Sequence, residues 1–216
     1  MIKPVVVYGA GGHGKVIAEI LLASGQQIAA FLDDNSALSG SHVLGFPVFP
    51  AAAWLQQNAG AQVALGIGDN FQRERAANQI ASFDGKLITA IHPSAIVARS
   101  ACIGAGVVIM PGAVLNPECH ICDGAILNTG AIVEHDVRIG RYVHLAPGCV
   151  TSGGVQVGDF AQIGIGAVVI PGKRIGNHAV IGAGAVVIDD IPPNVVASGV
   201  PARAHSQRQL HIAEKM

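Results

Sequence analysis

A histidine with carboxylates on both sides stands in the middle of the chain, at Glu134-His135-Asp136. A neighbouring carboxylate orients an imidazole ring and stabilises its protonated form. Histidine is also the usual proton acceptor at neutral pH, so a base at position 135 could remove a proton from a hydroxyl or an amine. Taken alone, the three residues fit either a general base or an ordinary charged corner of the chain.

A second motif has the spacing of a phosphate-binding loop. Residues 9–14 read Gly-Ala-Gly-Gly-His-Gly, which matches G-x-G-x-x-G. They follow an apolar strand at residues 5–8 and precede a helical pattern at residues 16–22. A second strand, residues 28–32, ends at Asp33-Asp34. Glycines let the backbone approach phosphates and a helix N-terminus stabilises their charge, so the motif predicts a nucleotide site.

The size of this region restricts the ligand. About 90 residues hold one mononucleotide-binding half, roughly half of what a six-stranded dinucleotide-binding sheet needs. A later strand at residues 63–67 ends at Gly68-Asp69-Asn70, the edge where a second ligand contact is usual. These dimensions favour a nucleoside monophosphate or a nucleotide diphosphate sugar. A purely structural glycine turn and an NAD site remain as alternatives.

The elements that must hold the histidine motif follow a six-residue period. Steps of six from Ile91 to Val187 meet seventeen positions, of which sixteen are Ile, Leu or Val and one is Thr151. The fourth residue after each position is small or aliphatic everywhere except at Lys173. Glycine directly follows the aliphatic position at Gly104, Gly140, Gly158, Gly164, Gly176 and Gly182. Neither the helical period of 3.6 nor the strand period of 2 gives this pattern, which indicates short strands stacked as a parallel β-helix.

This repeat resembles that of the hexapeptide-repeat acyltransferases. Their fold is a left-handed parallel β-helix, an exception to the right-handed crossover rule. Three hexapeptides make one triangular coil in that family, so seventeen imply between five and six coils. We therefore expect an α/β plus β fold. It would have a small Rossmann-like nucleotide-sugar-binding domain at residues 1–88, a left-handed β-helix acetyltransferase domain at residues 89–192 and a C-terminal tail at residues 193–216.

Composition excludes several classes of protein. Half of the 216 residues are hydrophobic, which excludes a disordered chain. Charged residues make up 12% and the net charge is −1, so the sequence lacks the basic footprint of a nucleic-acid or membrane-surface binder. It also lacks the ~18 unbroken apolar residues of a membrane span, and no signal peptide is evident. The predicted location is cytoplasmic.

Four cysteines in such a chain suggest free thiols in a reducing compartment. Cys119 and Cys122 have the C-x-x-C spacing of a redox or zinc site. However, Cys119 and Cys149 fall on the small inward position of the repeat, whereas Cys122 falls on a corner. Side chains that diverge in this way predict core thiols rather than metal ligands.

The two parts of the chain together resemble the bacterial sugar O- and N-acyltransferases of the sialic acid O-acetyltransferase type. That group includes N-acetyltransferases for nucleotide-linked 4-amino-4,6-dideoxysugars, such as the bacillosamine and perosamine pathway enzymes of glycan biosynthesis. The resemblance covers nearly the whole chain. It rests on residues 8–14, residues 67–70, Ile91-His92-Pro93-Ser94-Ala95, Asn128-Thr129-Gly130, Glu134-His135-Asp136 and Gly199-Val200-Pro201-Ala202-Arg203.

The resemblance implies the reaction centre. His135 would be the general base, with Asp136 as its partner. No serine or cysteine stands beside His135 in a nucleophile arrangement, so direct attack on acetyl-CoA is favoured over an acyl-enzyme. We expect a sequential, metal-free mechanism. The acetyl donor and co-substrate, acetyl-CoA, would contact His144, Gly153, Ile165 and Ala183, with the main chain of Gly153 as a donor to the thioester carbonyl.

The resemblance also implies the acceptor site and the assembly. A nucleotide-sugar substrate would contact Gly11, Gly12, His13, Asp33, Asp34, Gly68, Asn70 and Asn128, with Asn128 near the reacting sugar. His13 could instead be a helix N-terminal histidine without a ligand. Family members are homotrimers that bind CoA between neighbouring β-helices, so a homotrimer is expected.

The other histidines and several cations carry weaker expectations. Histidines in poorly patterned, terminal or variable repeat positions are expected to be exposed: His42, His120, His178, His205 and His211. Lys173 and Arg174 stand on otherwise uncharged coils, where they either reach CoA phosphates or keep the surface soluble. Arg203 has the same two interpretations.

Three other functions remain as alternatives to N-acetylation. An O-acetyltransferase acting on sialic acid or another sugar hydroxyl would share His135 and the CoA groove. A zinc enzyme of the β-helical carbonic anhydrase type needs three histidines, and the sequence offers no convincing third beside His135 and His144. A nucleotide-sugar sensor or trimeric scaffold would bind without turnover, and the intact Glu134-His135-Asp136 cluster argues against it.

Overall fold

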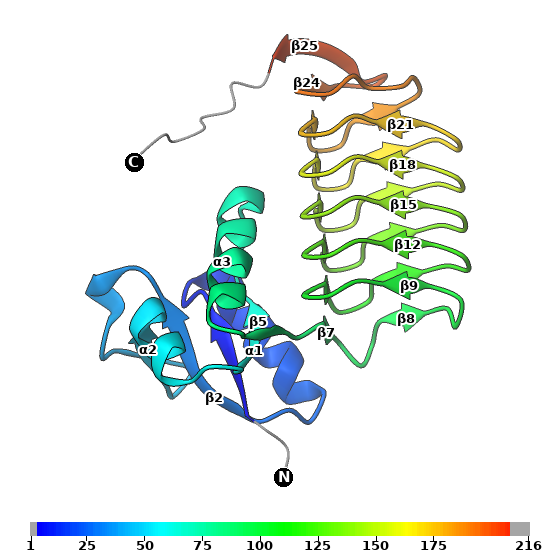
Figure 1. Ribbon diagram of the computed structural model, residues 1–216. Coiled ribbons are helices and arrows are strands. Elements are labelled where there is room, and N and C mark those ends of the chain that lie inside the picture. Colours follow the sequence, from blue (N-terminus) through cyan, green and yellow to red (C-terminus); the bar gives the residue numbers. More distant parts are fainter. Residues whose placement is uncertain (1–3, 208–216) are drawn as a thin grey trace.

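The computed structural model describes residues 4–207, which form an α/β domain followed by a β-helix (Figure 1). The α/β domain is built on a six-stranded sheet with the order β3-β4-β2-β1-β5-β6. All neighbouring strands are parallel except β3 and β4. The strands are β1 (Val5–Tyr8), β2 (Ile28–Asp33), β3 (His42–Val43), β4 (Phe46–Pro50), β5 (Gln62–Leu65) and β6 (Lys86–Leu87). The helices are α1 (Gly12–Ala23), α2 (Ala51–Gln57) and α3 (Asn70–Ser82), with a 3₁₀ turn at Ser36–Leu38.

The glycine-rich segment lets α1 pack tightly against the sheet. β1 is buried at all four residues and lies between β2 and β5. Gly9 leaves the strand with φ +111°, a conformation that L side chains rarely adopt. At Gly14, a Cβ would collide with the carbonyl of Gly9. The glycine spacing of the predicted phosphate loop therefore has a packing reason of its own, and its predicted role in ligand binding stays a prediction.

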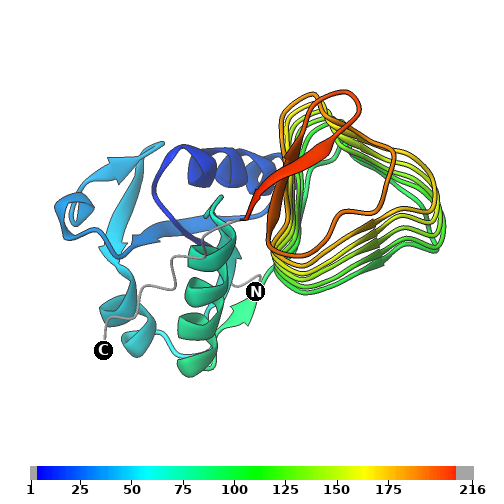
Figure 2. The same ribbon diagram turned by 90° about the horizontal axis from the view of Figure 1, so that it is seen from above.

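The second domain is a left-handed β-helix with three sheets, as predicted. The first sheet contains β7 (Ala90–Ile91), β10 (Val108–Ile109), β13 (Ile126–Leu127), β16 (His144–Leu145), β19 (Gln162–Ile163) and β22 (Val180–Ile181). The second contains β8 (Ile96–Val97), β11 (Val114–Leu115), β14 (Ile132–Val133), β17 (Val150–Thr151), β20 (Val168–Val169) and β23 (Val186–Val187). The third contains β9 (Cys102–Ile103), β12 (His120–Ile121), β15 (Arg138–Ile139), β18 (Gln156–Val157) and β21 (Arg174–Ile175). Seen along its axis the helix is a triangle (Figure 2).

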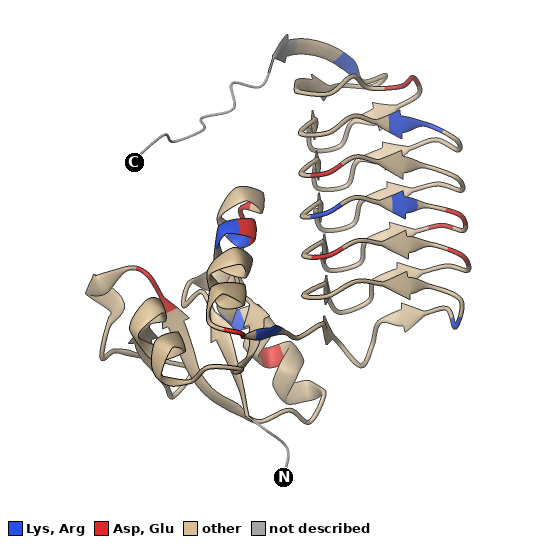
Figure 3. Ribbon diagram, viewed as in Figure 1, with Lys and Arg blue, Asp and Glu red and all other residues tan. Residues whose placement is uncertain are grey.

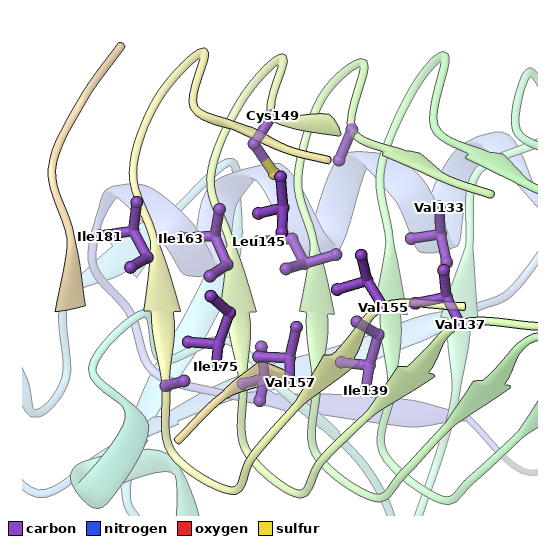
Figure 4. Close-up of a cluster of buried hydrophobic side chains, with 14 of the residues drawn as sticks. Val133, Val137, Ile139, Leu145, Cys149, Val155, Val157, Ile163, Ile175 and Ile181 are labelled. Atoms are coloured by element: carbon purple, nitrogen blue, oxygen red, sulfur yellow. The ribbon is translucent and has the colours of Figure 1, made fainter. Parts of the chain in front are cut away.

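The hexapeptide aliphatic position points into this triangle. From Ile109 to Val187 every member of the series is buried, and together with the small position they form one core (Figure 4). Ile91, on the first coil, is 36% exposed because no coil lies beneath it. Thr151, the one polar member, is fully buried, and its hydroxyl donates to the carbonyl of Ile132 at 3.3 Å. The narrow core explains why the sequence has so few aromatic residues.

The C-terminal segment closes the last coil. β24 (Val195–Ser198) adds to the first sheet parallel to β22, and β25 (Arg203–Gln207) pairs with β24 in an antiparallel arrangement. Part of the predicted tail is thus a hairpin on the β-helix. His211 lies outside the described residues.

Two apolar and aromatic contacts help to hold the domains together. In the first, Ile17, Ile20 and Leu21 of α1 share a buried apolar cluster with Val108 and Ile126 on the outer side of the first sheet. The second is made by α3, which runs beside the β-helix (Figures 1 and 2). Its Phe71 stacks on Phe160, with ring centroids 5.2 Å apart, and on His178, at 5.6 Å.

The aromatic contact corrects one expectation. His178 is half-buried rather than exposed, because its ring stacks on Phe160 at 5.0 Å in addition to Phe71. Tyr142 stacks on the other side of Phe160 at 5.5 Å. These three β-helix residues occupy the same corner of successive coils. His120 is half-buried as well, whereas His42 and His205 are exposed as predicted.

Two of the four cysteines, Cys119 and Cys149, are core thiols as predicted. Cys119 and Cys149 are buried inside the helix, where burial raises their pKa to about 11 and about 12. Cys102 and Cys122 are exposed on the outside. Among the described residues, no group of three or more His, Cys, Asp or Glu side chains could hold a metal ion.

Candidate active site

The first candidate cluster lies on the corner between the second and third sheets. His135 and Asp136 belong to the turn from β14 to β15, where Asp136 adopts φ +60°. His135 Nδ1 lies 2.7 Å from Asp136 Oδ2, and both side chains are 64% exposed. The hydrogen bond to Asp136 raises the pKa of His135, and the charges of Asp136 and Glu134 act in the same direction. With Nδ1 held by the carboxylate, Nε2 is the ring nitrogen available to take a proton.

Gly153 lies against this imidazole, on the next coil. A Cβ at Gly153 would stand 2.7 Å from both Cε1 and Nε2 of His135, closer than real Cβ contacts allow. The amide of Gly154 donates to the main-chain carbonyl of His135 at 3.0 Å. Glycine at position 153 therefore leaves the space that the ring of His135 occupies. The predicted contact of Gly153 with the thioester stays a prediction.

The second cluster lies at the junction of the two domains. His144, on β16 of the first sheet, has its Nε2 3.0 Å from Nδ2 of Asn128 on the coil below. The His144 ring also hydrogen-bonds to the backbone of Gly68 in the α/β domain. His13, in the first turn of α1, makes an edge-on ring contact with His144 at 6.2 Å. Four of the residues predicted to bind ligands thus come together from both domains.

Burial keeps both histidines of this junction neutral. Burial, together with the nearby positive charge of Arg73, lowers the pKa of His13 and that of His144 to about 4. The Nε2 atom of His13 is buried and has no hydrogen-bond partner among the described residues. At neutral pH these rings can donate or accept one hydrogen bond at each nitrogen, but they carry no charge.

Arg73, which is not among the site residues predicted from the sequence, fills the centre of the junction. This α3 residue is fully buried and spans from the loop after β5 to the first sheet of the β-helix. Its guanidinium donates to five main-chain carbonyls, those of Ile67, Gly68, Gly124, Tyr142 and Val143. Its only signal in the sequence is its place one helical turn after Asp69-Asn70.

The glycine loop leaves the N-terminus of α1 open. Gly11 is the N-cap residue and makes no side-chain cap, and both Gly11 and Gly12 are exposed with no atom near the place of a Cβ. Asp33 accepts hydrogen bonds from the amides of Ala10 and Asn35, at 2.8 and 2.9 Å, so its carboxylate holds the loop. The neighbouring Asp34 is exposed, and its Oδ2 lies 2.8 Å from the hydroxyl of the buried Tyr8.

Asn70 has a different place from the one expected of a ligand residue. Its side chain is 4% exposed and donates to the carbonyls of Phe160 and Ala161 at 3.0 and 3.3 Å. Its Oδ1 accepts from Arg73 at 2.9 Å. Because the amide is buried and used in these contacts, the structure gives Asn70 a part in domain docking, and its predicted substrate contact stays untested.

The other predicted CoA residues lie on another corner of the helix. Ile165, 61% exposed, and Ala183, also exposed, stack one coil apart where the first sheet turns into the second. The second sheet separates this corner from that of His135. One chain therefore does not bring His135 together with Ile165 and Ala183.

The cations near these sites have separate surroundings. Basic residues mark β15 and β21 on the third sheet (Figure 3), where Arg138 and Arg174 line a shallow groove of about 390 Å³. Arg203 pairs with Asp189 at 3.0 Å. A role of Lys173, Arg174 or Arg203 toward CoA phosphates stays a prediction.

Comparison with known proteins places this arrangement in a family. Residues 4–80 match the PglD N-terminal domain family. PerB of Caulobacter crescentus, solved with CoA and GDP-perosamine, is 42% identical, with a TM-score of 0.89 over 95% of this chain and 99% of that one. The chain belongs to the PglD-type nucleotide-sugar N-acetyltransferases of the hexapeptide-repeat class. This agrees with the family that the sequence motifs indicated.

Two further members of the PglD-type family support this placement. The acetyltransferase domain of PglB from Neisseria gonorrhoeae, also solved with acetyl coenzyme A, is 37% identical with a TM-score of 0.88, over 94% of this chain and 100% of that one. UDP-N-acetylbacillosamine N-acetyltransferase of Bacillus subtilis is 41% identical over 111 residues, which are 50% of this chain. This chain aligns with 51% of that enzyme's length. None of the helices among the described residues is long and apolar enough to cross a membrane.

Proposed function

We propose that this protein transfers the acetyl group of acetyl-CoA to the amine of a nucleotide-linked 4-amino-4,6-dideoxysugar. The observation that carries the proposal is the exposed His135–Asp136 pair, with Nδ1 of His135 on the carboxylate and Nε2 turned away from it. Support also comes from PerB, which is similar over nearly its whole length and was solved with CoA and GDP-perosamine. Histidine-to-asparagine and histidine-to-alanine variants of that enzyme bind the same two ligands.

In the proposed reaction, His135 acts as the general base. The amine lone pair of the sugar forms a C–N bond with the thioester carbonyl carbon, and the C–S bond of acetyl-CoA breaks. The amine proton passes to Nε2 of His135, and the sulfur of CoA leaves as a thiolate that takes up a proton. Asp136 stabilises the imidazolium formed on the way, as a carboxylate partner does in related proton transfers.

The junction of the two domains is the proposed acceptor pocket. The open N-terminus of α1 at Gly11 and Gly12 suits the pyrophosphate, because its free N–H groups and dipole favour negative charge. Asp33, Asp34 and Gly68 would contact the nucleotide and the sugar. Asn128 and the neutral His13 and His144 would supply hydrogen bonds to the sugar and the acetyl group.

We also propose that the active form is a homotrimer with CoA between neighbouring β-helices. Along the second sheet the outward side chains are all aliphatic: Ile96, Val114, Ile132, Val150, Val168 and Val186. An apolar row of this kind favours contact with another copy. Packing through this sheet would bring the His135 corner of one copy to the Ile165 corner of the next. His144 and Gly153 would complete the site.

The activity is tested by measuring CoA release through its free thiol. Acetyl-CoA is offered with UDP-, GDP- and dTDP-linked 4-amino-4,6-dideoxysugars, and separately with sialic acid, using His135→Asn as the control. Turnover with one amino sugar that is lost in the variant supports the proposal and names the nucleotide. Turnover with sialic acid alone would mean O-acetylation.

The assembly is tested by mixing two inactive variants. If His135 and Ile165 act from different copies, His135→Asn and Ile165→Asp should regain part of the activity when their subunits are exchanged. The mass in solution, measured by light scattering, should be three times the 22.0 kDa of one chain. A monomer with full activity would contradict the shared site.

A further inference from the structure

Arg73 is the only charged side chain that is buried among the residues the structure describes. Burying a guanidinium is costly unless its N–H groups find acceptors. Here Nε donates to the carbonyl of Gly124 at 2.7 Å, and Nη1 to those of Ile67 and Gly68 at 3.1 and 2.9 Å. Nη2 donates to the carbonyl of Tyr142 and to Oδ1 of Asn70, both at 2.9 Å. No carboxylate takes part in these contacts.

The pattern of acceptors distinguishes Arg73 from a general contact between domains. Ile67 and Gly68 belong to the loop that begins α3, whereas Gly124 and Tyr142 belong to two successive coils of the β-helix. These four acceptors are main-chain carbonyls, which cannot follow a misplaced guanidinium as a flexible side chain such as that of Asn70 would. The planar fork of Arg73 therefore fixes the distance and the register between a loop of one domain and a corner of the other.

The hydrogen bonds that Arg73 makes in each of the two domains lead to His144. The carbonyl of Gly68 accepts from Arg73, and the same residue hydrogen-bonds to the His144 ring. On the other side, Arg73 holds the carbonyl of Tyr142, two residues before His144, and reaches that of Val143 at 3.5 Å. Arg73 thus sets both the main chain that carries the His144 ring and the backbone partner of that ring.

We propose that Arg73 is a positioning residue, whose single buried guanidinium sets the Gly68 loop and the His144 coil in the register that aligns the acceptor pocket with the acetyl group. This inference deepens the proposed function and rests on it. Other contacts hold the domains together without Arg73, because α1 packs on Val108 and Ile126 and Phe71 stacks on Phe160. Loss of Arg73 should therefore loosen the register while the domains stay docked.

The kinetic test compares Arg73→Lys and Arg73→Met with Arg75→Lys and Arg75→Met. Arg75 lies on the same helix and is exposed, so its variants are matched controls. A misplacement of about 1 Å can cost about 10²-fold in rate, so kcat of both Arg73 variants should fall by about 10²-fold. The Kd of acetyl-CoA alone and that of the nucleotide sugar alone, measured by calorimetry, should change by no more than about 3-fold, since Arg73 is proposed to contact neither ligand and the domains stay docked.

Two results would overturn the inference. One is wild-type kcat in folded Arg73→Lys, which would make Arg73 a stability residue whose loss is visible only in the melting temperature. The other is a large loss in the binding of one substrate at unchanged kcat, which would make it a ligand contact. If Arg73→Met does not fold, Arg73→Lys decides, because its ammonium keeps the charge but cannot span both domains.

A spectroscopic readout separates this inference from the proposed reaction. In ¹⁵N-histidine spectra, His144 of the wild type should show one tautomer, since Gly68 and Asn128 hold its ring. The Arg73→Lys variant should show a mixture of tautomers, and Arg75→Lys should match the wild type. Absence of turnover in the wild type with every amino sugar would remove the proposed function. An unchanged His144 tautomer in Arg73→Lys would remove the positioning role by itself.

Discussion

The two histidine clusters of this protein place the same side chain in opposite environments. His135 stands in solvent, and its carboxylate partner raises its pKa. His144 lies at the domain junction, where burial and the charge of Arg73 lower its pKa to about 4. His135 is therefore able to accept a proton near neutral pH, whereas His144 stays neutral and only shares hydrogen bonds. The surroundings of each ring, rather than the residue type, decide which one can serve as a base.

The strongest test of this contrast is His135→Asn. Loss of a general base typically costs 10²–10⁴-fold, so we expect kcat to fall by about 10³-fold with little change in the melting temperature. The measurement is CoA release with the best amino-sugar acceptor. His120→Asn, at a half-buried position of the third sheet, is the control and should behave as the wild type. Full activity of His135→Asn would show that His135 is not the general base.

Gly153→Ala tests the exposed cluster without removing its histidine. The new Cβ would occupy the place of the His135 ring, 2.7 Å from Nε2, and would push the imidazole aside. We expect kcat to fall by about 10²-fold, because the base is displaced from its acceptor. Ser152→Ala on the same turn is the matched control. A crystal structure of the Gly153→Ala variant with an unmoved ring and full activity would contradict this explanation.

Asp136→Asn tests whether the carboxylate of Asp136 is what raises the pKa of His135 above that of the buried His144. His135 must be neutral to accept a proton, so the wild-type rate should rise with pH through the raised pKa of His135. Asparagine tolerates the positive φ of residue 136 but carries no charge, so the pKa of His135 should fall toward its ordinary value. The acid limb of the pH–rate profile should then move to lower pH, while the maximal rate drops by about 10-fold. If the acid limb of the Asp136→Asn profile stays at the wild-type pH, then the limb reports the titration of a group other than His135.

His144→Gln should have the smallest effect and leave the shape of the pH profile intact. With a pKa of about 4, His144 does not change its charge between pH 6 and pH 9. Glutamine can still hydrogen-bond with Asn128, so we expect a loss of about 3–10-fold in kcat/KM, the range of one hydrogen bond. A shift of the acid limb in this variant would show that His144 shares the titration attributed to His135.

The sequence predicted the β-helix well because each coil repeats the same physical requirement. An aliphatic residue every six positions must point into a narrow triangle, and from Ile109 to Val187 all of them do. The tight turn from β1 into α1 could also be predicted, because the spacing of the glycines places Gly9 at a positive φ and Gly14 against the carbonyl of Gly9. The pairing of His135 with Asp136 is likewise local, between neighbouring residues.

What the sequence did not show are contacts between parts that are far apart in the chain. Arg73 lies 51 residues before Gly124 and 69 before Tyr142, and nothing near Arg73 indicates that it is buried. Asn70 is predicted to contact the substrate from its place at a strand edge, and the sequence does not show that its amide also reaches 90 residues ahead to Phe160. The stack of Tyr142, Phe160 and His178 did leave a signal, an aromatic ring every 18 residues, which is one coil.

The hairpin of β24 and β25 also affects whether β-helices of different chains can stack end to end. A β-helix that simply stopped would offer a full ring of unpaired amides and carbonyls, on which the first coil of another chain could stack. The C-terminal segment covers all three edges: β24 pairs with β22, Ile191 with Ile175, and the main chain at Gly199 and Ala202 with Val186. β25 then adds an antiparallel strand on which a parallel coil does not continue. The segment that closes the β-helix thus pairs the strand edges on which a second chain would otherwise stack end to end.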